Sequence, residues 1–297
     1  MKKTIALLLS LVMLFAFAAC GEADPAESDA AGESAAPEES TAPEESTAPE
    51  ESAAAESDLA AIKEKGTLIV GITNFEPMDY QDENGEWIGF DADLAKAFAE
   101  SIGVTAEFQE IEWDNKVMEL DGHTIDVVWN GMTLTDEVLS AMECSNAYLN
   151  NAQVVVLPAD QAESYPDVES YPDVESMSGL NFAVESGSAG EQMAVENGLS
   201  YTPVVDQATA VLEVSSGTCD AAIIDSLMAA AMVGEGTSYA DLTYTINLNS
   251  EEYGVGFRKG SDMCEALNEF FVSAWADGTI QELADTYGVS AALIPQE

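Results

Sequence analysis

Residues 129–138, WNGMTLTDEV, combine a glycine, two hydroxyl side chains and the start of a helix. An apolar, strand-like run ends at Gly131, Thr133 and Thr135 follow, and we expect a helix to begin at Asp136. A glycine lets a ligand approach the backbone closely, and the unpaired N–H groups of a helix start, beside two hydroxyls, can bind an anion. The stretch therefore predicts an anion-binding site, although it contains no Arg or Lys.

The N-terminus has the pattern of a targeting segment. Two lysines precede an apolar run, residues 5–19, that is too short to cross a bilayer and is followed by Cys20. Residues 17–20, FAAC, are similar to a bacterial lipoprotein box, with Phe17 in place of the usual leucine. We expect residues 1–20 to be a lipoprotein signal peptide. We expect Cys20 to carry a lipid, such as palmitate, that anchors the chain to the outer face of the cell membrane. An ordinary signal peptide is the alternative.

Residues 21–58 form an acidic, low-complexity segment. They contain 13 acidic residues and no basic one, and the sequence APEEST repeats every six residues from Ala36. Such a composition cannot bury enough apolar surface to fold, and its like charges repel one another. We expect a disordered tether between the lipid anchor and a folded part.

The charge and the cysteine content exclude several functions. The chain has a formal net charge of −48, and only six basic residues follow the signal peptide, so nucleic acid is not an expected partner. The cysteines after Cys20 are Cys144, Cys219 and Cys264, an odd number at spacings that match no metal site, and which two could form a disulfide stays open. With a single histidine, His123, we expect no metal site and no cofactor.

Apolar strand-like runs alternate with helical patterns from residue 59 onward. This alternation predicts an α/β architecture with largely parallel sheets. The expected strands are residues 67–72, 104–108, 125–129, 153–157, 180–184, 202–205, 221–224 and 253–257, and helices begin near residues 91, 188, 206 and 263. The run is interrupted at residues 163–176, where ESYPDV occurs twice in tandem, which we interpret as a tolerated surface insertion.

Seven separated motifs occur in an order that resembles one family. They are GTLIVGITNFEPMDY, ENGEWIGFDADLAKAFA, WNGMTLTDEV, NAYLNNAQVVVL, VESGSAGE, SSGTCDAAIID and EYGVGFRKG. Together they resemble the bacterial extracellular solute-binding proteins of the polar amino acid ABC transporter type, family 3. The resemblance implies a two-lobed periplasmic-binding-protein-like fold (type II), with hinge crossings near residues 153–156 and 253–256. Lobe 1 would comprise residues 59–153 and 255–297, and lobe 2 residues 154–254.

The resemblance also implies a ligand site between the lobes. Phe75 and Trp113 match two aromatic positions, where rings can sandwich a side chain or face a cation, although either ring could simply be core. Asp225 follows an apolar strand and matches the carboxylate that binds the ligand ammonium; a helix N-cap is the alternative. The groups facing the ligand carboxylate would come from both lobes, namely Asn130, Gly131, Met132 and Thr133 from the first and Gly187 and Ser188 from the second, where Ser188 could also be a plain N-cap.

One position departs from the family pattern. Many members carry an arginine three residues after the second threonine, where it clamps the ligand carboxylate, and this chain has Val138 there. Either Lys116 and helix N-termini hold the carboxylate, or the ligand has none. Asn74 stands near a position where an acid is common, which removes one expected negative charge.

The resemblance implies a monomeric, non-catalytic lipoprotein of an ABC importer. It would capture a small polar or cationic amino acid-like solute and deliver it to the membrane permease. An enzyme on the same scaffold, similar to a dehydratase, is the alternative, with Asp225 and Glu185 as the candidate acid and base. Two clustered carboxylates without an aromatic sandwich would favour it. A surface sensor is a third possibility.

Overall fold

The computed structural model describes residues 57–165 and 174–297. The expected signal peptide, the lipidation site Cys20 and nearly all of the acidic tether lie outside the described residues, as does the middle of the ESYPDV insertion. Within those two ranges, no helix combines the length and the apolarity needed to span a membrane.

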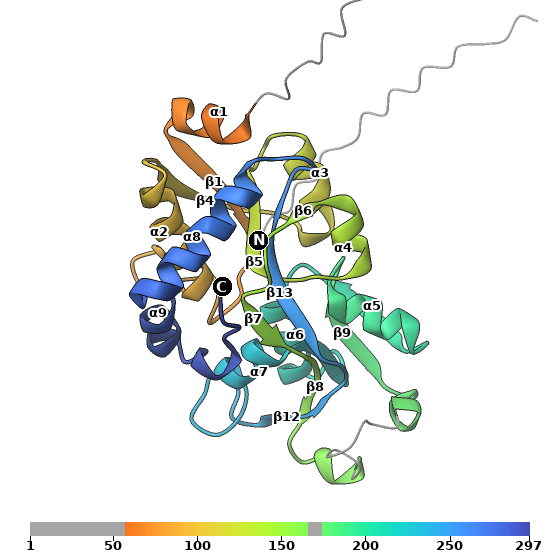
Figure 1. Ribbon diagram of the computed structural model, residues 1–297. Helices are drawn as coiled ribbons and strands as arrows, with labels where there is room; N and C mark the ends of the chain where they lie inside the picture. The colour runs from red at the N-terminus through yellow and green to blue at the C-terminus, as the bar shows by residue number, and fades with distance from the viewer. Residues whose placement is uncertain (1–56, 166–173) are drawn as a thin grey trace, which may run out of the picture. The chain divides into compact units, whose positions relative to one another are not determined.

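The first sheet contains β1 and the strands that pair around it in the order β4-β1-β5-β13-β6, with β7 also pairing with β13. β1 is parallel to both β4 and β5, whereas β13 is antiparallel to β5. Helices α2, α8 and α9 lie together on one side of this sheet (Figure 1). The bounds are β1 Thr67–Ile72, β4 Thr105–Glu110, β5 Val127–Thr133, β6 Glu143–Cys144, β7 Leu149–Asn151, β13 Glu251–Phe257, α2 Phe90–Ser101, α8 Met263–Asp277 and α9 Thr279–Tyr287.

The second sheet has five strands in the order β10-β9-β11-β8-β12. β9 is parallel to β10 and β11, and β8 is antiparallel to β11 and β12. Helices α5 and α6 pack against its central strands. The bounds are β8 Gln153–Pro158, β9 Asn181–Glu185, β10 Ser200–Val204, β11 Ala221–Asp225, β12 Leu242–Asn247, α5 Ala189–Glu196, α6 Gln207–Ser215 and α7 Ser226–Met232.

The chain changes sheet twice. It leaves the first sheet between Asn151 and Gln153 and returns between Asn247 and Glu251. Both expected crossings, residues 153–156 and 253–256, lie inside strands instead, because β8 begins at Gln153 and β13 begins at Glu251, where it pairs with β7. Each sheet is mixed rather than largely parallel, since strands next to the crossings run against their neighbours.

Short elements complete the described part. Gly278, at φ +91, ends α8, the helix expected to begin near residue 263, and α9 begins directly after it. β2 and β3 form a separate two-stranded hairpin. The remaining bounds are α1 Asp58–Lys65, β2 Tyr80–Gln81, β3 Trp87–Ile88, α3 Lys116–Asp121, α4 Asp136–Ala141 and the 3-10 turns Trp113–Asn115, Ala162–Ser164, Val174–Met177 and Ser290–Ala292.

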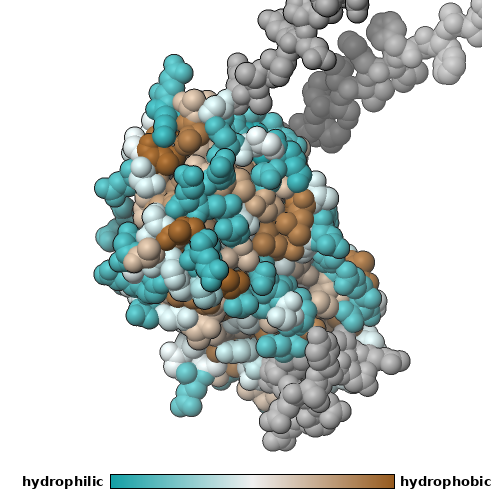
Figure 2. All heavy atoms as spheres, viewed as in Figure 1, coloured by the Kyte–Doolittle hydropathy of each residue, from teal (hydrophilic) through white to brown (hydrophobic). Residues whose placement is uncertain are grey.

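Apolar packing holds each sheet to its helices. In α2, Leu94 and Phe98 lie one helical turn apart and are fully buried, and Phe98 packs against Trp129 of β5 and Phe270 of α8. The visible surface is mostly hydrophilic, with apolar residues in small separate groups (Figure 2). The fold therefore fixes the carboxyl ends of β5, β9 and β11, where the candidate site lies.

Candidate ligand-binding site

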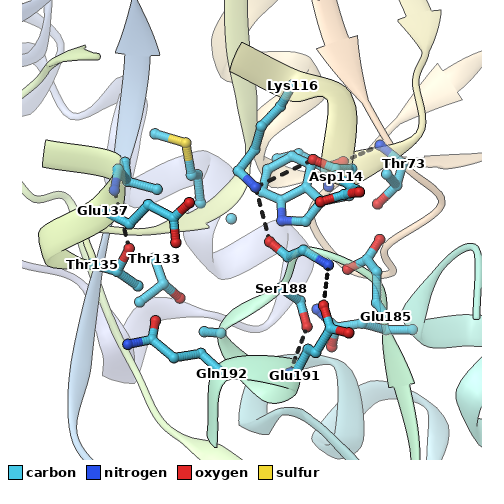
Figure 3. Close-up of a pocket in the computed structure, with 18 of the residues that line it drawn as sticks. Thr73, Asp114, Lys116, Thr133, Thr135, Glu137, Glu185, Ser188, Glu191 and Gln192 are labelled. Carbon is cyan, nitrogen blue, oxygen red and sulfur yellow. Dashed lines mark hydrogen bonds between the residues drawn. The ribbon is translucent and has the colours of Figure 1, made fainter. Parts of the chain in front are cut away.

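A cavity of about 320 Å³ lies where the two sheets face each other, and residues from both line it (Figure 3). Ten of the eleven residues expected at the site line this cavity: Phe75, Trp113, Lys116, Asn130, Gly131, Met132, Thr133, Gly187, Ser188 and Asp225. The exception is Asn74, which is exposed and does not line it. Asn74 lies after the end of β1, between the buried residues Thr73 and Phe75, and its own side chain is exposed to solvent.

The two aromatic residues are both buried and both line the cavity. Phe75 packs edge-on against Tyr253, with ring centroids 6.3 Å apart. The Trp113 ring lies 4.9 Å from the Lys116 ammonium, in the geometry of a cation–π contact. Each ring therefore belongs to a core cluster and also presents a surface to the cavity.

Gly131 uses its backbone N–H inside the protein. That N–H donates to Oδ2 of Asp91 at 2.6 Å, and Tyr148 also donates its hydroxyl to Asp91. Asp91 is fully buried, which raises its pKa to about 7 although these hydrogen bonds lower it. Gly131 lies within β5 rather than after it, at φ +55, where an added Cβ would come within 2.6 Å of the Phe75 ring. We expected this N–H to face the ligand carboxylate, but it is already bonded to Asp91.

Several of the other expected donors also have partners within the chain, whereas the side-chain nitrogen of Asn130 has none among the described residues. The Thr133 hydroxyl donates to Glu251 at 2.9 Å, and the Gly187 N–H donates to Glu191 at 2.7 Å. The Ser188 hydroxyl accepts the N–H of Glu191 and so caps α5, which is the N-cap interpretation of this serine.

Lys116 donates to backbone carbonyls rather than standing free as an anion ligand. Its Nζ lies 2.9 Å from the Gly187 oxygen and 3.2 Å from the Trp113 oxygen (Figure 3). Burial lowers the pKa of Lys116, while nearby carboxylates, with Glu185 the strongest, oppose that shift. Two of its three N–H donors are thus bonded within the chain, one of them across the cavity, and its role as a carboxylate clamp stays a prediction.

Asp225 lies at the end of β11 with both carboxylate oxygens bonded. Oδ1 accepts from the amides of Asn151 and Gln153, the latter at 2.7 Å, and Oδ2 accepts from the Gln207 amide. Its side chain does not cap α7, so the N-cap alternative does not hold. Burial, and then the charge of Glu251, raise the pKa of Asp225 to about 8.

Glu185 ends β9, the strand next to β11, and lies in the same cavity. It is only 2% exposed, and its Oε1 has no hydrogen-bond partner among the described residues. Burial is the main cause that raises its pKa to about 8, followed by the charges of Asp225 and Asp206. The sequence suggested Glu185 only as an acid–base candidate and not as part of the ligand contacts.

The rest of the lining is apolar at one end and acidic overall. Val138 is buried beside Met132 and Met142, where the family arginine would begin. Five acidic side chains line the cavity against one lysine: Asp114, Glu137, Glu185, Glu191 and Asp225. None of the ion pairs found within residues 57–165 and 174–297 includes any of them. Such a lining attracts cations and repels acids.

The sequence of the chain is similar to those of known solute-binding proteins. Residues 68–290 match the bacterial extracellular solute-binding proteins, family 3. The L-cystine-binding protein TcyJ of Escherichia coli K12 is 28% identical over 231 residues, 76% of this chain and 84% of the relative. The arginine-binding extracellular protein ArtP of Bacillus subtilis is 27% identical over 229 residues, 74% of this chain and 85% of the relative.

A solved structure gives the same fold. The crystal structure of an ancestral amino acid-binding protein, a precursor of cyclohexadienyl dehydratase, is 30% identical with a TM-score of 0.68, covering 78% of this chain and 99% of that one. The predicted two-lobed α/β fold is confirmed. Because the match spans most of the chain, the protein belongs to the bacterial extracellular solute-binding proteins, family 3.

Proposed function

We propose that this chain is the solute-binding component of an ABC importer and that it captures a small amine-bearing solute between its lobes. The observation that carries the proposal is Asp225, a buried carboxylate that three amide side chains hold at the cavity wall. A desolvated carboxylate in a fixed orientation binds an ammonium strongly, because no solvent has to reorganise around it.

The aromatic residues provide the second part of the binding. Phe75 and Trp113 line the cavity, and their ring faces attract cations as well as aliphatic chains. The named relatives support this class of ligand, since one binds cystine and the other binds arginine. The five acidic side chains add a field that favours a cationic solute over an acidic one.

The proposal includes the position of the protein in the cell. Lipidated Cys20 would hold the chain at the outer face of the membrane, and the acidic tether would let the folded part reach the permease as a monomer. Metabolic labelling with a palmitate analogue tests the anchor. Wild-type chain should incorporate the label, and Cys20→Ala should not.

A thermal-shift screen of the mature chain against the twenty amino acids, aliphatic amines and methylated amines tests the binding function. A ligand that binds only the folded state raises the melting temperature by mass action. We expect amines and basic amino acids to give the largest shifts and Asp225→Asn to lose them, with Asp160→Asn, at an exposed position outside the cavity, as the control. A flat response to every compound would refute the binding function.

One observation favours a second function. Glu185 and Asp225 are two buried carboxylates in one cavity, and burial raises the pKa of each toward the neutral range in which general acid–base groups act. The ring surfaces of Phe75 and Trp113 in the same cavity favour binding instead. Recovery of the bound ligand unchanged after prolonged incubation, checked by NMR, supports a receptor, whereas conversion of the ligand supports an enzyme.

A further inference from the structure

Glu185 differs from Asp225 in one respect that bears on the ligand. Both carboxylate oxygens of Asp225 accept amide N–H groups of the protein. Glu185, which is equally buried, leaves Oε1 without a partner among the described residues. A buried, unpaired carboxylate oxygen is costly, and Glu185 lines the cavity, so a hydrogen-bond donor on a ligand can supply the missing partner.

The two carboxylates end neighbouring strands and line the same cavity. Glu185 and Asp225 each end a strand, and those strands, β9 and β11, are parallel neighbours. Two adjacent buried carboxylates cannot both be ionised cheaply unless positive charge lies between or beside them. Lys116, the one basic residue that lines the cavity within the described ranges, directs its ammonium to the carbonyls of Gly187 and Trp113.

The opposite requirement, a place for a carboxylate, is poorly met. Val138 stands where an arginine would reach in, and the N–H groups of Gly131 and Gly187 are held by Asp91 and Glu191. The Asn130 side-chain nitrogen, which has no partner among the described residues, is a neutral donor and does not replace an arginine. A ligand carboxylate would therefore lie among five acidic side chains without a guanidinium to neutralise it, which costs free energy through repulsion.

We propose that the site selects a short aliphatic diamine that carries no carboxylate, with one ammonium on Asp225 and the other on Glu185. The methylene chain would lie against Phe75 and Trp113. In this arrangement, Glu185 favours a diamine over a monoamine because it binds the second ammonium. The lack of an arginine at residue 138 favours a diamine over an amino acid because nothing there binds a carboxylate. This inference rests on the proposed binding function and narrows its ligand class.

Calorimetry with two matched ligand series tests the inference on the whole mature protein. The series are butylamine, putrescine and ornithine, and pentylamine, cadaverine and lysine. Within each series the second compound adds an ammonium and the third adds a carboxylate to that diamine. We expect the diamine to bind at least about tenfold more tightly than either neighbour, the usual effect of one charged hydrogen bond.

Substitution of Glu185 tests whether this residue binds the second ammonium of the ligand. We expect Glu185→Gln to weaken diamine binding by about tenfold or more and to leave monoamine binding within about threefold. Glu100→Gln, an exposed position of α2 outside the cavity, should change neither. The ligand series on unmodified protein needs no variant to fold, so it decides the ligand class by itself.

The outcomes are distinct. If ornithine or lysine binds as tightly as its diamine, or if Glu185→Gln leaves the ratio of diamine to monoamine affinity unchanged, the inference is wrong while the binding function stands. If none of the six compounds binds, but another amine or amino acid does, the inference alone is wrong. If no amine or amino acid binds at all, both are wrong.

Discussion

The ammonium nitrogen of Lys116 lies 2.9 Å from the carbonyl oxygen of Gly187, so α3 of the first lobe is bonded to the loop that precedes α5 in the second. Gly187 lies at φ +72, and its backbone is so close to Asp114 that an added Cβ would lie 2.6 Å from the Asp114 Cα. These contacts describe a closed cavity, in which the absence of a side chain at residue 187 lets the two lobes meet.

Substitution of Gly187 tests this closure. Gly187→Ala adds a methyl group that meets the Asp114 backbone, so we expect the lobes to close incompletely and every ligand to bind about tenfold or more weakly, mainly through faster dissociation. Stopped-flow dissociation rates give the measurement. Gly198→Ala is the matched control, because Gly198 has a similar φ of +64 and open space around it. Equal effects of the two substitutions would mean that backbone strain, and not closure, is responsible.

Restoring an arginine at residue 138 tests why the expected carboxylate clamp is missing. Val138 is buried at the cavity wall, so in Val138→Arg a guanidinium can reach a ligand carboxylate and form two parallel hydrogen bonds. We expect at least about a tenfold gain for lysine relative to cadaverine, measured by calorimetry. Leu139→Arg adds the same charge at the next residue, which is exposed and outside the cavity, and should leave the ratio unchanged. If the Val138 variant also leaves it unchanged, residue 138 does not determine ligand choice.

The buried carboxylates predict how stability depends on pH. Burial raises the pKa values of Asp225 and Glu185 to about 8 in the folded protein, far above their ordinary values of 3.8 and 4.5. Because the folded state holds these protons more tightly than the unfolded state, their stabilising contribution is present below about pH 4 and is lost as the pH rises to about 8. Between these two pH values, each of the two groups lowers the free energy of unfolding by about 1.4 kcal/mol per pH unit. The groups facing them are Glu251 and Tyr253 for Asp225, and Asp206 and Lys116 for Glu185.

Urea unfolding of the ligand-free protein at several pH values measures this contribution. We expect Glu185→Gln to be more stable than wild type by about 1 kcal/mol or more at pH 8.5, because the variant buries no charge, and to lose that advantage at pH 5. Glu100→Gln should show no such trend. A Glu185 variant whose stability difference is the same at both pH values would contradict the assignment of a raised pKa to this residue.

Sequence patterns predicted the main elements, because those depend on local signals, and the family resemblance predicted ten of the 23 residues that line the cavity. Asp225 follows an apolar strand and Ser188 begins a helix, and both positions are visible along the chain. The partner of Gly131 was not predictable in this way, since Asp91 lies 40 residues away and reaches it only through the packing of α2 on β5. The bond between Lys116 and Gly187 likewise depends on lobe closure, which no local pattern encodes.

The unpaired oxygen of Glu185 could not be predicted from the sequence either. An acidic residue at the end of an apolar strand is visible in the sequence, but its unpaired oxygen is a property of the surrounding amides, which bond to Asp225 and Glu251 instead. Both crossings were misplaced by a few residues, because β8 already begins at Gln153 and the pairing of Glu251 with Asn151 starts β13 before residue 253.

A crystal structure of the mature protein grown with the tightest-binding compound of the thermal-shift screen tests the central claim most directly. The account predicts electron density for the ligand in this cavity, with an amine nitrogen within hydrogen-bond distance of the Asp225 carboxylate and its carbon chain against Phe75 and Trp113. A ligand bound elsewhere, or one that presents no amine nitrogen to Asp225, would contradict it.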